Sequence, residues 1–504
     1  MAHIRFAAEE LDLFSRASHD RNPLHMSDDY TQRTAYGGRV VFGVLNALAA
    51  LGQSHLRRHP GRALSSIECE FFDVALLGIN YSVSTSDGPA QQATVRVTDG
   101  RRPLLEMILT FRSGEPEAFE RRQEFSASSL PCRDLQRADL TVGYRASGRY
   151  AACEPDLSAL CAHAGLHETW AKDRAVSALL WASYLIGMEL PGKRALFSRL
   201  RFEFEPSASP SSPFDYEAEI QAISEVGELG IEASLSSGGK LWAKAQLGAH
   251  IREDLPSANT ATIERMVGHS EALAGTVAFV TGGSRGLGAA LVRALALHGS
   301  TVVLNFVKRQ VEAENVRDSL SQTAGTIVLE RGDVANLAWC LELQQRLKAT
   351  LKRLDFLFCN ASPPLLPLWL EPSTAARVNE FVNRSLAMVT TPMAALLPVL
   401  SETKGWNVLI SSTAVSQIHP FFPHYAAAKA GAEAIVRAAS AEYRTISSLI
   451  ARPARLLTDL TNTPLGRRGA IAPECVAATI VRRLKGQPIP GKIEVLEQFP
   501  SDQD

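Results

Sequence analysis

The sequence predicts two halves of different fold class: an α+β half with a long antiparallel sheet, followed by an α/β half with a doubly wound parallel sheet. In the first half, several strand-like segments follow an apolar helical stretch, which is the order of an antiparallel sheet around a helix. In the second half, short apolar strands alternate with helices, as in a parallel sheet. Between them, residues 253–271 contain Pro256, Ser257 and Asn259 with few apolar side chains, and they mark the main boundary.

The composition is that of an ordinary soluble globular protein, since 46% of the 504 residues are hydrophobic and 21% are charged. At about 150 residues a domain, this length predicts roughly three domains. The net charge of −1 gives no indication of a nucleic-acid surface or of a polybasic membrane anchor.

The seven cysteines are odd in number and never spaced C-x-x-C, which predicts reduced thiols and no metal site. The N-terminus leads into Glu9, Glu10 and Asp12 without the apolar core of a signal sequence. No run of about 18 apolar residues occurs in the chain. We therefore expect a cytoplasmic protein with no membrane partner.

The first half begins with a predicted helix over 8–17, because apolar residues recur there at helical spacing. The run from Val40 to Leu51 is apolar nearly all round and predicts a helix enclosed by other structure. Strands are predicted at 65–74, 80–85, 92–98 and 104–111.

The stretch that joins the two helices, residues 18–25, reads SHDRNPLH, and its Asn22-Pro23 pair stiffens a turn. It holds a carboxylate, Asp20, and an imidazole, His25, five positions apart. Adding water to a double bond needs a base for the water and an acid for the carbon, and this pair supplies both. An Asp and a His beside such a turn also occur as caps and surface contacts.

Residues 6–113 resemble a MaoC-type (hydratase 2) hot-dog domain, whose pattern is a small residue, Asp, x, Asn-Pro, a hydrophobic residue and His, then a helix headed by Gly. The resemblance implies that Asp20 and His25 are the catalytic pair. It also implies that the backbone N–H of Gly43 faces the thioester oxygen of the substrate. The family usually has His before that glycine, where this chain has Phe42.

A similar order of elements is predicted in a second domain, residues 117–253, after a first domain at 1–116. A helix over 174–188 precedes strands at 195–205, 214–224, 230–237 and 240–250. This order resembles a second hot-dog unit and implies a double hot-dog fold. No Asp-x-Asn-Pro-x-His pattern occurs in it. We expect this domain to complete the sheet and shape the acyl tunnel, with His163 and His167 as ordinary polar residues.

The second half is expected to be one domain, residues 273–504, after a linker at 254–272. It opens with a short strand over 274–280, a glycine-rich turn over 281–288 (TGGSRGLG) and a helix. Glycines in such a turn let the backbone approach a pyrophosphate, which then lies at the helix N-terminus.

From Ala274 onward the sequence resembles the short-chain dehydrogenase/reductase family, which has a Rossmann-type fold. The resemblance implies an active-site tetrad of Asn383, Ser412, Tyr425 and Lys429. The expected cofactor-binding residues are Thr281, Gly282, Ser284, Arg285, Gly286, Leu287, Gly288, Asn305, Asp333, Val334, Asn360, Ala361, Tyr425, Lys429, Pro453 and Thr458.

Tyr425 and Lys429 are one helical turn apart, so the ammonium can lower the pKa of the phenol and make it a proton donor near neutral pH. Ser412 is expected to hold the substrate carbonyl, and Asn383 a water. The strand expected at 301–306 is followed by no carboxylate, and Arg285 lies in the glycine turn. The cofactor is therefore predicted to be NADP.

Together the two halves predict a bifunctional enzyme of fatty acid or polyketide metabolism. One site would reduce a 3-oxoacyl thioester to a 3-hydroxyacyl thioester, and the other would interconvert (R)-3-hydroxyacyl and trans-2-enoyl thioesters. The substrate partner would be an acyl-CoA or an acyl carrier protein, and the reductase resemblance implies a homo-oligomer.

Two alternatives stay open. The protein could be a monofunctional reductase whose hot-dog half only binds the acyl carrier, a reading that Phe42 favours. It could also perform the same chemistry on a biosynthetic substrate that is not a fatty acid.

Overall fold

The computed structural model describes residues 2–54, 56, 61–88, 91–114, 119–121, 131–206, 210–254, 260–320 and 325–500. The chain divides into two compact units, Met1–Glu253 and Asp254–Asp504. The large sheet of the first unit is antiparallel and that of the second is parallel, as the sequence predicts.

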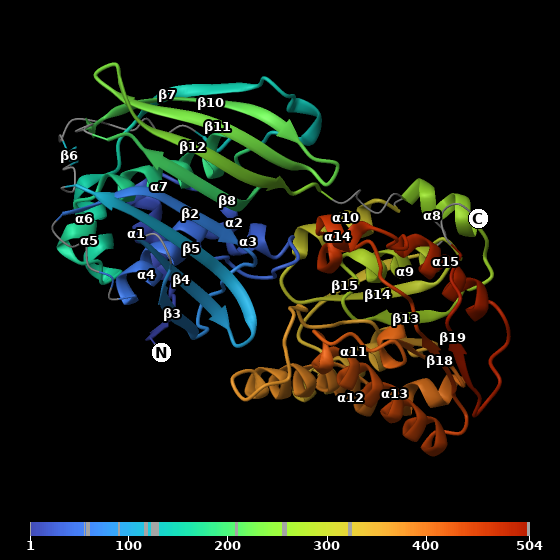
Figure 1. Ribbon diagram of the computed structural model, residues 1–504. Helices are drawn as coiled ribbons and strands as arrows, with labels where there is room; N and C mark the ends of the chain where they lie inside the picture. The colour runs from blue at the N-terminus through green and yellow to red at the C-terminus, as the bar shows by residue number, and fades with distance from the viewer. Residues whose placement is uncertain are drawn as a thin grey trace. The chain divides into compact units, whose positions relative to one another are not determined.

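The first unit is built on a ten-stranded sheet in the order β1-β3-β4-β5-β2-β8-β12-β11-β10-β7 (Figure 1). A separate two-stranded sheet joins β6 (Glu120–Arg121) to β9 (Ser211–Ser212). The strands of the large sheet are β1 (Ala2–Ile4), β2 (Arg62–Phe71), β3 (Tyr81–Asp87), β4 (Gln92–Asp99), β5 (Arg102–Ser113), β7 (Arg145–Tyr150), β8 (Ala195–Phe204), β10 (Phe214–Ile223), β11 (Glu228–Ser237) and β12 (Lys240–Ile251). The long strands fall at the predicted places, with ends shifted by a few residues.

This sheet consists of two matching halves. From each edge inward the halves run β1-β3-β4-β5-β2 and β7-β10-β11-β12-β8. They meet where β2 pairs antiparallel with β8, from Ser66↔Glu203 to Glu70↔Arg199. Apart from α3, β6 and β9, the order of strands and helices along the chain is the same in both halves, so the first unit is an internal repeat.

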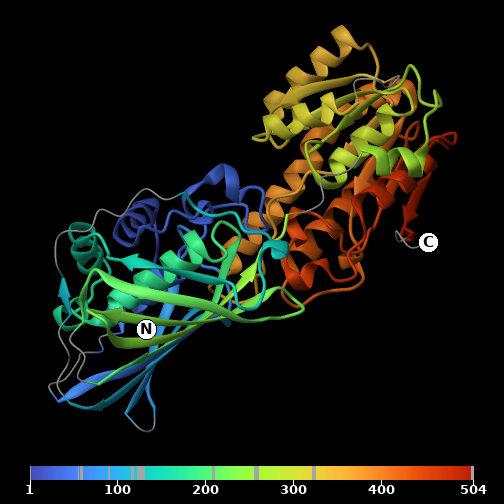
Figure 2. The ribbon, with the colours of Figure 1, turned by 90° about the horizontal axis from the view of Figure 1, so that it is seen from above.

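Each half has one long apolar helix before its long strands, α4 (Gly43–Gln53) in the first and α7 (Arg174–Tyr184) in the second. A π-helical turn, Leu185–Glu189, continues α7. The strands curve around these helices, blue in the first half and green in the second (Figure 2). The shorter helices are α1 (Ala8–Ser18), α2 (Pro23–Met26), α3 (Asp28–Thr31), α5 (Glu154–His163) and α6 (Glu168–Ala171).

The apolar helix predicted from Val40 begins only at Gly43. The backbone N–H of Val40 donates to Leu24 at 3.2 Å, and that of Val41 donates to Ala75 at 2.9 Å. These partners hold the start of the apolar run in an extended conformation, because its backbone groups bond to other segments instead of to a helical turn.

Two close approaches between the halves require glycine. A Cβ at Gly52, near the end of α4, would lie 1.9 Å from the carbonyl oxygen of Ala164. A Cβ at Gly187, in the π-helical turn, would lie 2.3 Å from Oδ1 of Asp20. Each long helix therefore packs directly on the segment that follows the first helix of the other half.

The segment predicted as a linker, 254–272, is partly helical. Helix α8 (Thr260–Val267) packs against α9 (Gly286–Ala296) and α15 (Pro473–Leu484) of the second unit and buries Ile263 completely. The sequence did not predict this helix, because a single buried side chain, Ile263, anchors it and leaves no apolar periodicity in the stretch.

The second unit has a seven-stranded parallel sheet in the order β15-β14-β13-β16-β17-β18-β19. The chain moves outward from β13 to one edge and then from β16 to the other, so the order reverses between β13 and β16. In such sheets ligands bind at the carboxyl ends of the strands, at this reversal. The strands are β13 (Val277–Val280), β14 (Thr301–Phe306), β15 (Ile327–Arg331), β16 (Phe356–Cys359), β17 (Trp406–Ile410), β18 (Ser447–Ala451) and β19 (Ile493–Leu496).

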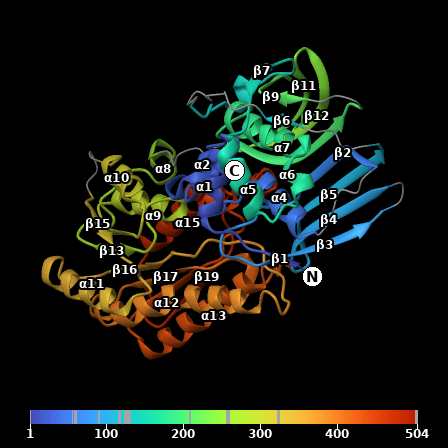
Figure 3. The ribbon, with the colours of Figure 1, turned by 90° about the vertical axis from the view of Figure 1, so that its left-hand side faces the viewer.

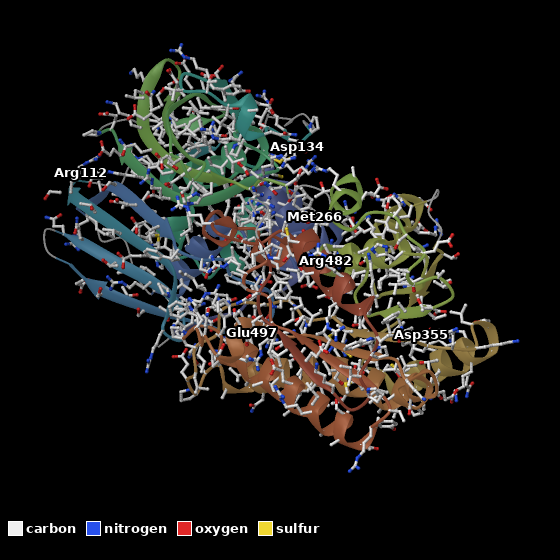
Figure 4. All side chains as sticks on the ribbon, turned by 90° about the vertical axis from the view of Figure 1, so that its right-hand side faces the viewer. Arg112, Asp134, Met266, Asp355, Arg482 and Glu497 are labelled. Atoms are coloured by element: carbon white, nitrogen blue, oxygen red, sulfur yellow. The ribbon has the colours of Figure 1, made fainter. Side chains whose placement is uncertain are left out.

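Helices cover both faces of this sheet (Figure 3). One face carries α9 (Gly286–Ala296), α10 (Gln310–Asp318) and α15 (Pro473–Leu484), and the other carries α11 (Leu337–Thr350), α12 (Ala375–Thr403) and α13 (Pro423–Glu442). By length and composition alone α12 could cross a membrane, but here it packs against α11, α13 and β16. At the amino ends of the strands, Asp355 (Figure 4) accepts a hydrogen bond from the N–H of Val277 at 2.8 Å and forms an ion pair with Arg353.

The contact at Gly52 predicts a specific loss of stability. Gly52→Ala should lower the free energy of unfolding of the first unit by about 1–3 kcal/mol, because its Cβ meets a backbone oxygen that cannot move alone. Urea denaturation followed by circular dichroism measures this loss. Gly38→Ala is the matched control, since nothing lies within 4 Å of its Cβ. Equal stability of the two variants would contradict the prediction.

Candidate active site

The turn after α1 is fixed by hydrogen bonds to both halves of the repeat. His19 takes the left-handed conformation, with φ of 62°, and ends α1. The Asn22 side chain accepts from the N–H of Leu24 at 2.9 Å and so caps α2. Its amide nitrogen donates to the carbonyls of Gly187 at 3.1 Å and Gly192 at 3.0 Å. The Asn-Pro pair thus anchors the turn to the second half.

Asp20 is buried, with 2% of its surface exposed. Its Oδ2 accepts from the hydroxyl of Ser183 at 2.7 Å, and its Oδ1 accepts from the N–H of Asn22 at 3.0 Å. Burial raises the pKa of Asp20 to about 7, against the opposing effect of these two hydrogen bonds. The carboxyl group can therefore hold or release a proton near neutral pH.

His25 is neutral at that pH. Burial is the main cause that lowers its pKa to about 4, and the positive charge of Arg252 adds to it, while a hydrogen bond to Val40 opposes it. That bond joins Nδ1 to the carbonyl of Val40 at 2.7 Å, which assigns the proton to Nδ1 and leaves a lone pair on Nε2. Phe42 stacks on the imidazole, with centroids 3.9 Å apart and planes 28° apart. The residue that departs from the family pattern thus orients the ring.

Asp20, His25 and Gly43 line one cavity of about 170 Å³. Gly43 is the first residue of α4, and a Cβ there would lie 3.0 Å from the ring of Phe71. The second half contributes Ser183 and other side chains to the same cavity. A proton donor, a proton acceptor and a helix N-terminus therefore line one cavity, as acid–base chemistry beside a developing oxyanion requires.

The second half has no such pair at the equivalent place. His167 caps α6 by accepting from the N–H of Thr169 at 3.3 Å, as Asn22 caps α2. Counted from these caps, Gly165 stands where Asp20 stands and Trp170 stands where His25 stands. The second half instead supplies Ser183 and Gly187 to the first site. No local sequence pattern identifies these two residues, because Ser183 is 163 positions from Asp20.

In the second unit, Ser412, Tyr425 and Lys429 come together at the carboxyl end of β17. Ser412 follows β17, and the other two lie in the first turns of α13. The hydroxyl of Ser412 hydrogen-bonds the Tyr425 side chain. The ammonium of Lys429 lies 5.6 Å from the centroid of the Tyr425 ring and donates to the carbonyl of Ile410 at 2.8 Å.

The expected effect of Lys429 on the Tyr425 pKa is wrong for the ligand-free site. Burial raises the pKa of Tyr425, and only its hydrogen bond with Ser412 opposes the shift. Burial also lowers the pKa of Lys429 to about 8, with Cys359 acting against it. The ammonium of Lys429 donates a hydrogen bond to the carbonyl of Ile410.

Asn383 is not joined to this group. Its side chain is exposed, and among the described residues no hydrogen bond links it to Ser412, Tyr425 or Lys429. Two positions further along α12, the hydroxyl of Ser385 is buried and has no hydrogen-bond partner within the described part of the chain. The tetrad role of Asn383 therefore stays a prediction, and Ser385 is a polar group that the sequence pattern did not single out.

The glycine turn forms a cradle at the start of α9. The hydroxyl of Thr281 accepts from the N–H groups of Asn360 at 2.9 Å and Ala361 at 3.0 Å. The Asn360 amide donates to the carbonyls of Thr281 and Gly282. A Cβ at Gly288 would lie 2.2 Å from the carbonyl oxygen of Gly282. This close backbone packing at a helix N-terminus fits a pyrophosphate.

The remaining predicted cofactor residues lie around this cradle. The Asn305 amide oxygen accepts from the N–H of Gly282 at 3.4 Å, and its nitrogen donates to Gly332 at 2.9 Å. The carboxylate of Asp333 accepts from Arg384 at 2.8 Å. Leu287 and Val334 are buried, and Ser284 is 9% exposed. The carbonyl of Pro453 accepts a hydrogen bond from the N–H of Thr413. The methyl group of Thr458 would lie 3.2 Å from a Cβ at Gly286.

Two guanidinium groups lie beside the cradle and share one carboxylate. Arg285 pairs with Asp459 at 2.7 Å, and Arg309 approaches the same oxygen at 3.5 Å. Arg309 follows β14, the strand whose end selects the cofactor in this kind of sheet. The sequence pattern gave no reason to expect Asp459 between them.

The parallel sheet, the glycine turn before α9 and the Ser-Tyr-Lys group define an oxidoreductase that uses a nicotinamide dinucleotide. The family described as short chain dehydrogenase matches residues 276–464. A 3-oxoacyl-[acyl-carrier-protein] reductase from Synechocystis is 31% identical over 228 residues, which cover 42% of this chain and 89% of that protein. The chain therefore belongs, through its C-terminal half, to the short-chain dehydrogenase family.

Other similar proteins cover the same half. A hydroxynaphthalene reductase-like protein from Metarhizium brunneum is 27% identical over 191 residues, covering 37% of this chain and 71% of that protein. The crystal structure of a dehydrogenase/reductase from Sinorhizobium meliloti is 24% identical, covers 47% of this chain and 98% of that one, and has a TM-score of 0.41.

Proposed function

We propose that the protein is a bifunctional acyl-thioester enzyme of the cytoplasm. Its second unit reduces a 3-oxoacyl thioester with NADPH, and its first unit, a double hot-dog fold, interconverts (R)-3-hydroxyacyl and trans-2-enoyl thioesters. The observation that carries the hydration and dehydration activity is that Asp20, His25 and Gly43 line one cavity. The acyl-carrier substrate in the name of the Synechocystis relative supports the reductase activity.

In the reduction, a nicotinamide dinucleotide would supply the hydride that adds to the 3-oxo carbon. The Thr281–Gly288 turn would hold the pyrophosphate of that dinucleotide. Ser412 donates a hydrogen bond to the carbonyl oxygen and fixes its position. Tyr425 gives its proton to that oxygen as the negative charge develops, and the ammonium of Lys429 stabilises the phenolate that remains. The product carries a 3-hydroxyl group.

The first unit can eliminate this hydroxyl. The free Nε2 of His25 takes a proton from C2, and the protonated carboxyl group of Asp20 gives a proton to the departing hydroxyl, which leaves as water. The N–H of Gly43 at the helix N-terminus stabilises charge on the thioester oxygen. Hydration is the same path in reverse.

The binding-module alternative rested on Phe42. Because this ring stacks on His25 and leaves both proton-transfer groups in the cavity, Phe42 gives no reason to deny the first unit an activity.

The two activities separate in a product assay. With 3-oxobutyryl-CoA and NADPH, the wild-type chain should give 3-hydroxybutyryl and but-2-enoyl thioesters by mass spectrometry. Asp20→Asn should stop at the hydroxy product, with enoyl hydration slowed by about 10²–10⁴-fold. Tyr425→Phe should lose NADPH oxidation and keep the hydration of added enoyl thioester. A wild-type chain that stops at the hydroxy product would leave the first unit as a binding module, and undiminished enoyl product from Asp20→Asn would exclude Asp20 as the acid.

The pKa values of the pair predict a bell-shaped pH profile of kcat/KM for dehydration of the 3-hydroxyacyl thioester. Activity should fall below about 4, where His25 gains a proton, and above about 7, where Asp20 loses one. Ser183→Ala removes a hydrogen bond that lowers the pKa of Asp20, so the falling limb should move to higher pH. Ser177→Ala, on the same helix, is the control. A limb that moves to lower pH in Ser183→Ala would refute this assignment.

Cofactor preference tests the proposed contact of Arg309 with the 2′-phosphate of NADPH. NADPH should be used in preference to NADH, and Arg309→Ala should raise the KM for NADPH by about tenfold with little effect on that for NADH, because one charge-assisted bond to the 2′-phosphate is lost. Initial rates at varied cofactor concentration give both constants. A clear preference of the wild-type chain for NADH would overturn the NADP proposal.

A further inference from the structure

Two polar residues that line the cavity of the first unit have no part in the acid–base chemistry, and each has one atom without a hydrogen-bond partner. Oδ1 of Asn46 and Nδ1 of His250 both belong to residues that line it, and both atoms are buried. Neither has a hydrogen-bond partner among the residues that the structure describes. Asn46 as a whole is only 3% exposed.

The two groups come from different halves of the repeat. Asn46 lies one helical turn after Gly43 on α4, so the two residues share a face of the helix. His250 lies near the end of β12, opposite Leu196 of β8, which also lines the cavity. Asn46 and His250 therefore line the same cavity as Asp20 and His25, and two separate elements place them there.

A buried polar group without a partner is unfavourable, and native proteins pair nearly all of them. An amide and an imidazole can each donate or accept a hydrogen bond, depending on orientation and tautomer. An alkyl chain in this cavity would leave both groups unpaired. A ligand with its own hydroxyl, carbonyl or amide group would satisfy them.

The size of the cavity points the same way. Its volume of about 170 Å³ is below the 300–1,000 Å³ that is typical of pockets for drug-sized ligands. A small ligand in such a space places its polar substituents within reach of the walls, so recognition by hydrogen bonds becomes decisive.

We propose that the cavity selects a short acyl thioester whose chain carries a hydrogen-bonding group beyond C3, recognised by Asn46 and His250. This inference rests on the proposed function and names its substrate class, a small polar acyl group and not a plain fatty acyl chain. A site built to hydrogen-bond a substrate group discriminates strongly against the analogue that lacks it, because its own polar groups are then left unpaired.

The test compares two thioesters of equal size in the full chain without nicotinamide cofactor, so that only the first unit acts. They are trans-2-pentenoyl-CoA and 4-hydroxy-trans-2-butenoyl-CoA, in which a hydroxyl replaces the terminal methyl group. Hydration by the wild-type chain should favour the hydroxylated compound by about tenfold or more in kcat/KM. Asn46→Leu and His250→Phe should each shift this ratio by about tenfold toward the plain compound.

Leu45→Met is the matched control on α4, since Leu45 is buried but does not line the cavity, and it should leave the ratio unchanged. A wild-type ratio near unity would overturn the inference. An equal loss for both compounds in Asn46→Leu would also overturn it and would place Asn46 at the thioester. If neither compound is hydrated, the proposed function fails. Calorimetric binding of the same two thioesters then decides the inference alone: tighter binding of the hydroxylated compound supports it, and equal binding overturns it.

Discussion

The hydrogen bond from Ser183 to Asp20 is the constraint on which the first unit depends. It joins an acid in one half of the repeat to the central helix of the other, at 2.7 Å and out of contact with water. It also opposes the upward shift of the Asp20 pKa that burial causes. Because Asp20 lies against Gly187, the turn that carries it cannot move without moving the second half. The hydrogen bond from Ser183 to Asp20 therefore both joins the two halves and acts on the pKa of Asp20.

This contact explains why the second half persists without a site of its own. Its equivalents of Asp20 and His25 are Gly165 and Trp170, so it offers no acid–base pair. Its value lies in what its central helix presents to the first half, which is a hydroxyl for Asp20, a glycine for close packing and part of the cavity wall. An isolated first half would expose the carboxyl group to water, and the pKa near 7 that burial produces would be lost.

The sequence was most informative where the determining forces are local. Alternation and turn residues predicted the long strands of the first unit, and helical spacing predicted α1. The glycine turn predicted the cradle before α9, because close backbone approach needs glycine at fixed offsets. Prediction failed where the partner is distant. Val40 is extended because its N–H donates to Leu24. Ser183 reaches Asp20 across the fold, and burial, which no spacing reveals, raises the pKa of Tyr425.

Asp459 gives the dinucleotide cradle a property of its own. Its carboxylate pairs with both Arg285 and Arg309, so one negative charge partly offsets the two positive charges of the free site. Any anion that binds between the two guanidinium groups must compete with it, and cofactor entry there is an exchange of one anion for another. Asp459 directly follows Thr458, so this exchange also acts on the segment that lies over the start of α9.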